Sequence, residues 1–91
     1  MPAFREFEMK AIRLMASGVL SEEQLHAIEA LDGPCRYTYT GSGYYLAISH
    51  FSLPIEQKTL SDPPVVGNFG EVQAGFVVFL GDQELTLECH T

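Results

Sequence analysis

Five side chains in this sequence belong to the types that most often bind metal ions or act as nucleophiles: His26, His50, His90, Cys35 and Cys89. Their spacing forms neither a C-x-x-C nor an H-x-x-x-H unit, the short patterns that direct two ligands toward one ion. Cys89 and His90 are neighbours in a segment with strand periodicity, so their side chains should point to opposite faces of a sheet. The sequence therefore predicts no metal site.

Nucleophilic catalysis would require Cys35 or Cys89 to be activated by a histidine such as His50. No strand-to-helix elbow is predicted to hold such a nucleophile, because the helical segments come first and the strands follow. We expect reduced, half-buried thiols, although one disulfide between the two cysteines is also compatible with the pattern. A small enzyme that uses one of these thiols is a third reading of the sequence, and it predicts an abnormally reactive cysteine.

Glu84 and Glu88 form the clearest pair of carboxylates, because they share one face of the expected C-terminal strand. Acid–base catalysis would need one of them in an apolar pocket that raises its pKa. Their face also carries Thr86 and His90, which indicates a solvated surface. The glycines between residues 67 and 75 match neither the dinucleotide-binding nor the P-loop pattern. We therefore expect no enzyme activity and no cofactor.

The same residues are more informative as a candidate surface for protein contact. Glu84, Glu88 and His90 would present an acidic row, while Tyr37 and Tyr39 would supply aromatic anchors of the kind common in interfaces. The chain carries twelve acidic and five basic residues, for a net charge of −7. This charge opposes direct binding to nucleic acid or to an anionic membrane. It permits a basic protein partner, and it equally suits the simpler role of keeping the domain soluble.

Two helices are expected before any strand. Residues 4–17 place apolar side chains at three- to four-residue spacing and predict an amphipathic helix that ends at Gly18 in a left-handed cap. The apolar stripe consists of Phe4, Phe7, Ala11, Leu14 and Met15. Ser21-Glu22-Glu23-Gln24 matches a capping box and predicts the start of a second helix, which Asp32-Gly33-Pro34 should end. The short connection between them predicts an antiparallel pair.

The apolar period changes from that of a helix to that of a strand after residue 34. Residues 35–40 alternate, a turn at residues 41–43 follows, and residues 44–49 predict a second strand. One face of the first strand carries Cys35, Tyr37 and Tyr39. The two segments therefore predict a β-hairpin with an aromatic face.

The remaining residues predict a loop and then more strands. We expect residues 51–64 to form a loop, and residues 65–66 to begin a short strand that the following Gly-Asn-Phe-Gly segment ends. Residues 71–80 are apolar on both faces and predict a central strand. Gly81-Asp82 fits a type II′ turn into a last strand at residues 84–90. The inward face of that strand should carry Leu85, Leu87 and Cys89.

Helices followed by strands predict an α+β fold with a single domain at residues 1–91. In it, two N-terminal antiparallel helices (residues 3–32) pack on one face of a four- to five-stranded, mainly antiparallel sheet (residues 35–91). No segment approaches the ~20 apolar residues of a membrane span. Glu6 and Glu8 interrupt any signal-peptide pattern, so we expect a cytoplasmic protein.

Four segments carry a resemblance that spans most of the chain. They are Phe-Glu-Met-Lys at residues 7–10, Gly-Ser-Gly-Tyr-Tyr at 41–45, Gly-Glu-Val-Gln-Ala-Gly-Phe-Val-Val-Phe-Leu at 70–80, and Leu-Thr-Leu-Glu-Cys-His-Thr at 85–91. Through them the chain resembles a group of small bacterial proteins of uncharacterised function, which are similar to candidate immunity partners of polymorphic toxins. The shared segments are structural, mainly turns and strands, so the resemblance implies a kind of partner but no functional residues.

Two hypotheses from different classes follow from these observations. The first is a small, acidic, non-enzymatic protein-binding domain, such as an inhibitor or immunity protein for a basic toxin. Its association should be fast and sensitive to salt. The second is a self-associating domain, for example a homodimer, with a structural or regulatory role. The high apolar content and the free sheet edges of a small fold favour that alternative.

Overall fold

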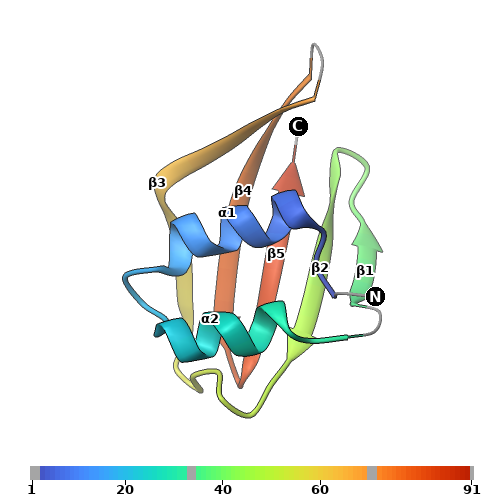
Figure 1. The fold of residues 1–91 in the computed structure, drawn as a ribbon. Helices are drawn as coiled ribbons and strands as arrows, with labels where there is room; N and C mark the ends of the chain where they lie inside the picture. Colours follow the sequence, from blue (N-terminus) through green and yellow to red (C-terminus); the bar gives the residue numbers. More distant parts are fainter. Residues whose placement is uncertain (1–2, 33–34, 70–71, 91) are drawn as a thin grey trace.

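The computed structural model describes residues 3–32, 35–69 and 72–90, which form two helices followed by strands (Figure 1). The elements are α1 (Glu6–Ala16), α2 (Glu22–Glu29), β1 (Arg36–Tyr39), β2 (Gly43–Ser49), β3 (Lys58–Phe69), β4 (Val72–Gly81) and β5 (Glu84–His90). The predicted α+β class is confirmed, because the helices precede a separate antiparallel sheet.

The sheet is antiparallel throughout, with the strand order β1-β2-β5-β4-β3. β2 pairs with β5, the last strand, and not with β3, the next one along the chain. Residues 50–57 therefore carry the chain past the ends of β5 and β4 to the far edge of the sheet (Figure 1). This crossover makes a Greek key of β2 to β5. It also places Tyr44 directly opposite Cys89.

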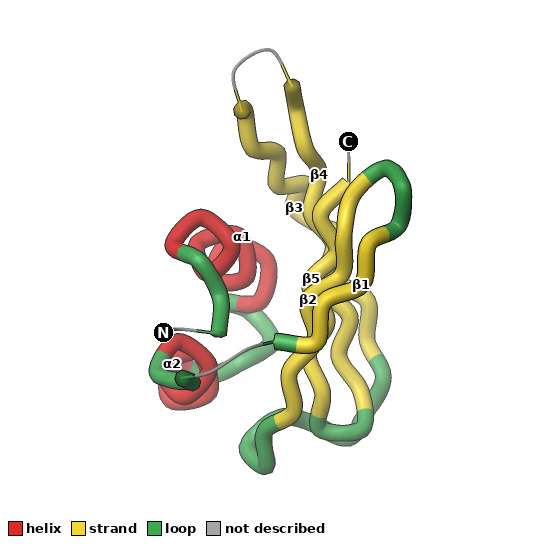
Figure 2. The backbone as a smooth tube through the Cα atoms, turned by 90° about the vertical axis from the view of Figure 1, so that its right-hand side faces the viewer, coloured by secondary structure: helices red, strands yellow, loops and turns green. Residues whose placement is uncertain are grey.

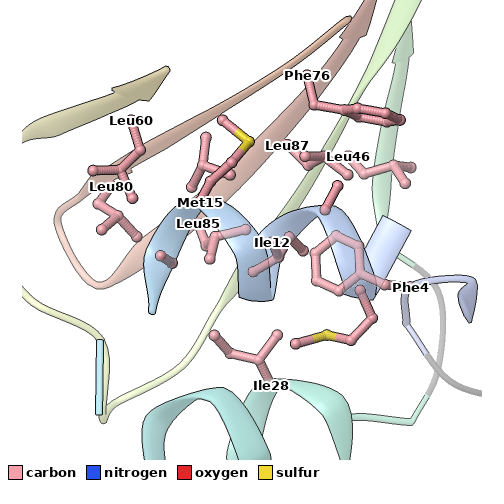
Figure 3. Packing of buried hydrophobic residues seen from close by; sticks show 14 of the residues in the cluster. Phe4, Ile12, Met15, Ile28, Leu46, Leu60, Phe76, Leu80, Leu85 and Leu87 are labelled. Carbon is pink, nitrogen blue, oxygen red and sulfur yellow. The ribbon is translucent and has the colours of Figure 1, made fainter. Parts of the chain in front are cut away.

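Both helices lie on the same face of the sheet and run in opposite directions across it (Figures 1 and 2). No described element covers the other face (Figure 2). The apolar core fills the space between the two layers. In Figure 3, Ile12 and Met15 of α1 lie beside Leu85 and Leu87 of β5, and Ile28 of α2 points toward α1. The second face of the sheet therefore has no described helix or strand packed against it.

The buried face of α1 differs from the predicted stripe. Leu14, which the stripe included, is 52% exposed, whereas Glu8 and Ile12, which it left out, are buried. The full buried set of α1 is Glu8, Met9, Ala11, Ile12, Met15 and Ala16. The prediction was wrong because α1 packs against both α2 and the sheet. That position requires a broader buried face than a narrow stripe, and one carboxylate falls within it.

The start of α2 is as the sequence predicted. The Ser21 hydroxyl accepts a hydrogen bond from the Gln24 N–H at 3.2 Å, and the Gln24 side-chain oxygen accepts one from the Ser21 N–H at 2.7 Å. This reciprocal pair is the predicted capping box. The helix ends at Glu29, earlier than expected, and the predicted stop at residues 33–34 lies outside the described residues.

The end of α1 is not the left-handed cap that was predicted. Gly18 is not among the residues with positive φ. Instead, the N–H groups of Val19 and Leu20 both donate to the carbonyl of Ala16, at 2.9 and 2.8 Å. These bonds close the helix with right-handed backbone, so no left-handed residue is required.

The strand β3 is longer than the sequence predicted. The expected loop at residues 51–64 is shortened to residues 50–57, because the strand already begins at Lys58. The Gly-Asn-Phe segment after Val66 continues the strand and does not end it. The two prolines at residues 63–64 led to the wrong prediction. β3 is an edge strand with a register shift between Leu60 and Val65, and edge strands and bulges tolerate prolines because their outer N–H groups need no partner.

The turn between β4 and β5 differs in type from the prediction. Its central residues are Asp82 and Gln83, with φ values of 51° and 59°, so it is a type I′ turn and not a type II′ turn centred on Gly81. The bounds of β5 are confirmed, as is the burial of Leu85, Leu87 and Cys89. The start expected for the preceding strand, at Glu71, lies outside the described residues.

Candidate functional site

The residues predicted to contact a partner lie on opposite faces of the sheet. Glu84, Glu88 and His90 of β5 alternate with buried residues and therefore occupy the uncovered face. Tyr37 and Tyr39 of β1 lie opposite residues of β2 whose side chains face the helices. The structure brings together the acidic row but does not join it to the tyrosines in one surface.

The uncovered face mixes carboxylates with apolar side chains. Glu88 lies between Tyr45 of β2 and Val77 of β4, and both neighbours are half-buried. The hydrogen bond to Glu88 raises the pKa of the Tyr45 phenol above its ordinary value, and the nearby negative charge adds to the effect. In the adjacent row Phe79 of β4 is 37% exposed. Val77 and Phe79 belong to the stretch predicted as a central strand, and both are partly open to solvent.

One end of this face carries an ion pair and a groove. Arg36 of β1 reaches past β2 to form an ion pair with Glu84. The Arg36 and Glu84 side chains are 66% and 39% exposed, so the pair contributes little to stability. Beside it lies a groove of about 310 Å³, lined by the ends of β3, β4 and β5, including Phe79 and Asp82. The groove gives this end of the face a shape into which a partner could fit.

His90 lies at the other end of the uncovered face, between two glycines of the neighbouring strands. A Cβ atom at Gly75 would come within 2.7 Å of the His90 ring, so the missing side chain leaves room for the imidazole. Gly43 is required for a different reason, because a Cβ atom there would overlap the backbone carbonyl of Cys89. The side chain of His90 is exposed, while Cys89 beside it is buried in the core.

The two predicted tyrosines lie at the edge of the sheet, beyond the cover of the helices. Tyr37 is 60% and Tyr39 69% exposed. The Tyr37 ring stacks on Tyr44, with ring centroids 5.6 Å apart and planes 28° apart. The Tyr39 hydroxyl donates to the carbonyl of Gly41 at 3.2 Å. These contacts hold the two exposed rings in place at the edge.

A buried carboxylate was missed by the sequence reasoning. Glu8 is 1% exposed and accepts two hydrogen bonds, from the Arg5 N–H at 2.7 Å and from the Tyr44 hydroxyl at 2.6 Å. No buried side-chain nitrogen or oxygen in the described part of the chain lacks a partner. The network ties the start of α1 to β2. The burial of Glu8 could have been predicted from its helical spacing with Ile12 and Met15, which places all three side chains on one face of α1.

The groups around Glu8 are held in their neutral forms. Burial raises the pKa of Tyr44, and the hydrogen bond to Glu8 and its negative charge raise it further. Burial is also the main cause that raises the pKa of Cys89 and of Cys35, whose thiol donates to the carbonyl of Ala3. Both cysteines are free thiols. A thiol with a raised pKa stays protonated at neutral pH and is a weak nucleophile.

His50, the histidine considered as an activator of a thiol, makes its ring contacts with residues 51 and 52 of its own loop. Its Nδ1 atom forms a hydrogen bond with the Ser52 hydroxyl at 2.6 Å and accepts one from the Ser52 N–H at 3.1 Å, and its ring stacks on Phe51 with centroids 4.6 Å apart. Among the described residues, no group of three or more His, Cys, Asp or Glu side chains lies close enough to hold a metal ion. No helix in that part of the chain is long and apolar enough to cross a bilayer.

No family model matches the sequence, and no curated protein or solved structure matches it significantly. The resemblance to candidate immunity proteins therefore stays a prediction. The surfaces of the molecule itself carry the functional inference.

Proposed function

We propose that this chain is a small, acidic, non-enzymatic domain that binds a basic protein, as an inhibitor or immunity protein for a basic toxin would. The observation that supports this most is the uncovered sheet face. There Glu84 and Glu88 lie among Tyr45, Val77 and Phe79, so negative charge and partly exposed apolar surface occur together. Interfaces combine these two features, because apolar contact supplies affinity while charge selects the partner.

The charge and the cysteine chemistry agree with this proposal. A net charge of −7 attracts a basic partner over distances of about a Debye length, roughly 8–10 Å, and makes association salt-dependent. The raised pKa values of Cys35 and Cys89 support a role that uses no nucleophilic thiol. The same two free thiols support a reducing, cytoplasmic location.

The test is capture of a partner by the immobilised domain from a lysate of the source cells, at low and at high salt. We expect a basic protein that binds at low salt and is released by added salt. The contact face is tested with Glu84→Lys plus Glu88→Lys. The matched control is Glu6→Lys plus Glu29→Lys, which changes the net charge equally on the helical side.

Three outcomes separate the explanations. If only the β5 variant, Glu84→Lys plus Glu88→Lys, loses the partner, the result supports contact through the uncovered face. Equal loss in both variants indicates long-range attraction without a defined contact. Retention in the β5 variant would overturn the uncovered face as the binding site. Circular dichroism of each variant shows whether the fold is kept, which we expect because all four side chains are partly or fully exposed.

Self-association is a second candidate function, favoured by the outer edge of β1. All four β1 residues are exposed. The Thr40 N–H donates to the Gly43 carbonyl, which makes Thr40 a residue whose backbone groups face β2. Because these groups alternate in direction along an antiparallel strand, those of Tyr37 and Tyr39 point away from β2. Two copies paired along this edge would form a continuous sheet. Sedimentation at increasing concentration tests this, and a constant monomer mass would exclude it. Tyr39→Pro should lower the mass of any dimer, because it removes an outward N–H.

A further inference from the structure

The crossover loop, residues 50–57, holds two large apolar side chains in solvent. Phe51 is 83% exposed, the highest value among the large hydrophobic residues of the described chain, and Ile55 is 69% exposed. Leu53 lies between them in sequence and is 3% exposed, within the core. The middle of the loop is therefore fixed to the protein interior, while the apolar side chains on either side of it are not buried.

Both exposed residues are attached to the same two-residue turn between β4 and β5. The Gln83 side-chain amide donates to the Phe51 carbonyl at 2.9 Å. The Asp82 N–H donates to the Ile55 carbonyl at 3.0 Å, and the Gln83 N–H donates to the Pro54 carbonyl at 3.0 Å. Because Asp82 and Gln83 are adjacent, these bonds hold the Phe51 and Ile55 backbones close to one another. The two residues therefore belong to one hydrogen-bonded unit of loop and turn.

The backbone of the β4–β5 turn is locally strained at the two residues that bond the loop. Asp82 and Gln83 both have positive φ, a conformation that glycine adopts more readily than glutamine. A glycine at position 83 would relieve the strain but could not donate to the Phe51 carbonyl. Residues held in such conformations persist where the surrounding structure requires them, and they cluster at functional sites.

The helical side of the loop is fixed as well. The Gln24 side-chain amide donates to the Ser52 carbonyl at 2.7 Å, which joins the loop to the first turn of α2. The His50 ring accepts a hydrogen bond from the Ser52 N–H at 3.1 Å and supports one side of the Phe51 ring by stacking. The backbone around Phe51 is therefore fixed by hydrogen bonds, while its ring is exposed and rests on the His50 ring. An anchor that is ordered before binding loses little conformational entropy in the complex.

The charges carried by these attachment points are mainly negative. Glu56 belongs to the loop, Asp82 to the turn, and Glu23 precedes Gln24 in α2, and all three are exposed. The nearest base in the sequence is Lys58, the first residue of β3, which directly follows the loop. A partner that covers Phe51 and Ile55 must bring its own charges near these carboxylates. Positive charge on the partner is therefore favoured, and negative charge is opposed.

We propose that Phe51 and Ile55 form a preformed docking site for a basic protein segment, which packs an apolar side chain against them and places Lys or Arg near Glu23, Glu56 and Asp82. This inference rests on the proposed function and adds to it a second contact, separate from the acidic row of β5. The aromatic anchor in a rigid loop supplies apolar contact, and the surrounding carboxylates select a basic partner.

The test is a titration followed by amide chemical shifts, with a synthetic amphipathic Lys/Leu peptide as the probe and a Glu/Leu peptide of the same length as its counterpart. We expect the Lys/Leu peptide to shift the amides of residues 50–57 and 82–83. Phe51→Gln plus Ile55→Gln should weaken its binding by about tenfold or more. The matched control, Leu14→Gln plus Val66→Gln, removes two other exposed apolar side chains and should bind as the wild type does.

Each other outcome overturns part of the proposal. If the Lys/Leu peptide shifts only β5, or binds nowhere, the loop is not the docking site, although capture of a basic partner through Glu84 and Glu88 could still succeed. If the Glu/Leu peptide binds equally well, the basic character of the partner is wrong. If sedimentation shows a dimer that Phe51→Gln plus Ile55→Gln dissociates, the loop binds a second copy of this chain. Failure of salt-sensitive capture would instead contradict the proposed function and leave the loop result intact.

Discussion

Replacing Tyr44 with phenylalanine removes a single oxygen and leaves one oxygen of the Glu8 carboxylate without its donor. Glu8 is 1% exposed, so water cannot easily replace the lost bond. A hydrogen bond to a charged group contributes about 1.5–3 kcal/mol, and an unsatisfied buried acceptor costs a similar amount. We expect the free energy of unfolding to fall by about 2 kcal/mol. For a domain of this size, that corresponds to a decrease in Tm of roughly 8–16 °C.

The assay is urea unfolding followed by circular dichroism at neutral pH. The matched control is Tyr45→Phe, because Tyr45 is the next residue of β2 and also bonds a glutamate, Glu88, but on the uncovered face. We expect the control to leave the unfolding midpoint nearly unchanged. A double-mutant cycle with Glu8→Gln should give a coupling energy of about 0.5–3 kcal/mol.

Two results would refute this reasoning. If Tyr44→Phe and Tyr45→Phe lower the midpoint equally, burial of Glu8 does not control the cost of the lost bond. If the effects of Tyr44→Phe and Glu8→Gln simply add, the two side chains do not interact as the structure indicates. In either case the network would not be what fixes α1 to β2.

Three further predictions follow from the same contacts. Gly43→Ala should lower Tm far more than Gly75→Ala. The new Cβ atom at position 43 overlaps the backbone of Cys89, whereas the one at position 75 meets only the movable imidazole of His90. Thermal unfolding that ranks the two variants the other way would contradict this. Cys35 and Cys89 should react with iodoacetamide more slowly in the native protein than in urea at neutral pH, and fast native labelling would contradict their raised pKa values. Stability should fall as pH rises through 9 and above, since the unfolded chain then loses thiol and phenol protons that the native state retains. Urea midpoints measured across that pH range test this. Tyr44→Phe should make the midpoint fall less steeply with pH, and a wild-type midpoint that does not change with pH would contradict the prediction.

Features that depend on near neighbours in the chain were predictable from the sequence. The capping box at Ser21 and Gln24 forms within one helical turn, and the alternation of β5 follows from the two-residue period of a strand. The acidic row of Glu84 and Glu88 was predictable for the same reason. Each of these features is specified by residues within a few positions of one another, so no knowledge of the tertiary fold is needed to recognise it.

The candidate sites themselves were only partly predictable. The sequence indicated that residues 51–64 deserved notice as a loop, but it could not show that Phe51 and Ile55 are exposed or that a turn far along the chain holds them. It grouped Tyr37 and Tyr39 with the acidic residues as contacts, although the two sets lie on opposite faces. Which face of a strand is covered depends on where the helices pack, and local periodicity does not contain that information.

The sequence by itself determined the α+β class, the helix start at Ser21, and the inward and outward faces of β5. The tertiary structure alone decided that β2 pairs with β5, that Glu8 is buried against Tyr44, and that the crossover loop is fixed to the β4–β5 turn. The Glu8 and Tyr44 side chains are 36 residues apart in sequence, and the bond between Gln83 and Phe51 spans 32. Local patterns arise from the repeat of a helix or a strand, whereas these contacts form only when distant segments are brought together, and no short-range spacing encodes which segments will meet.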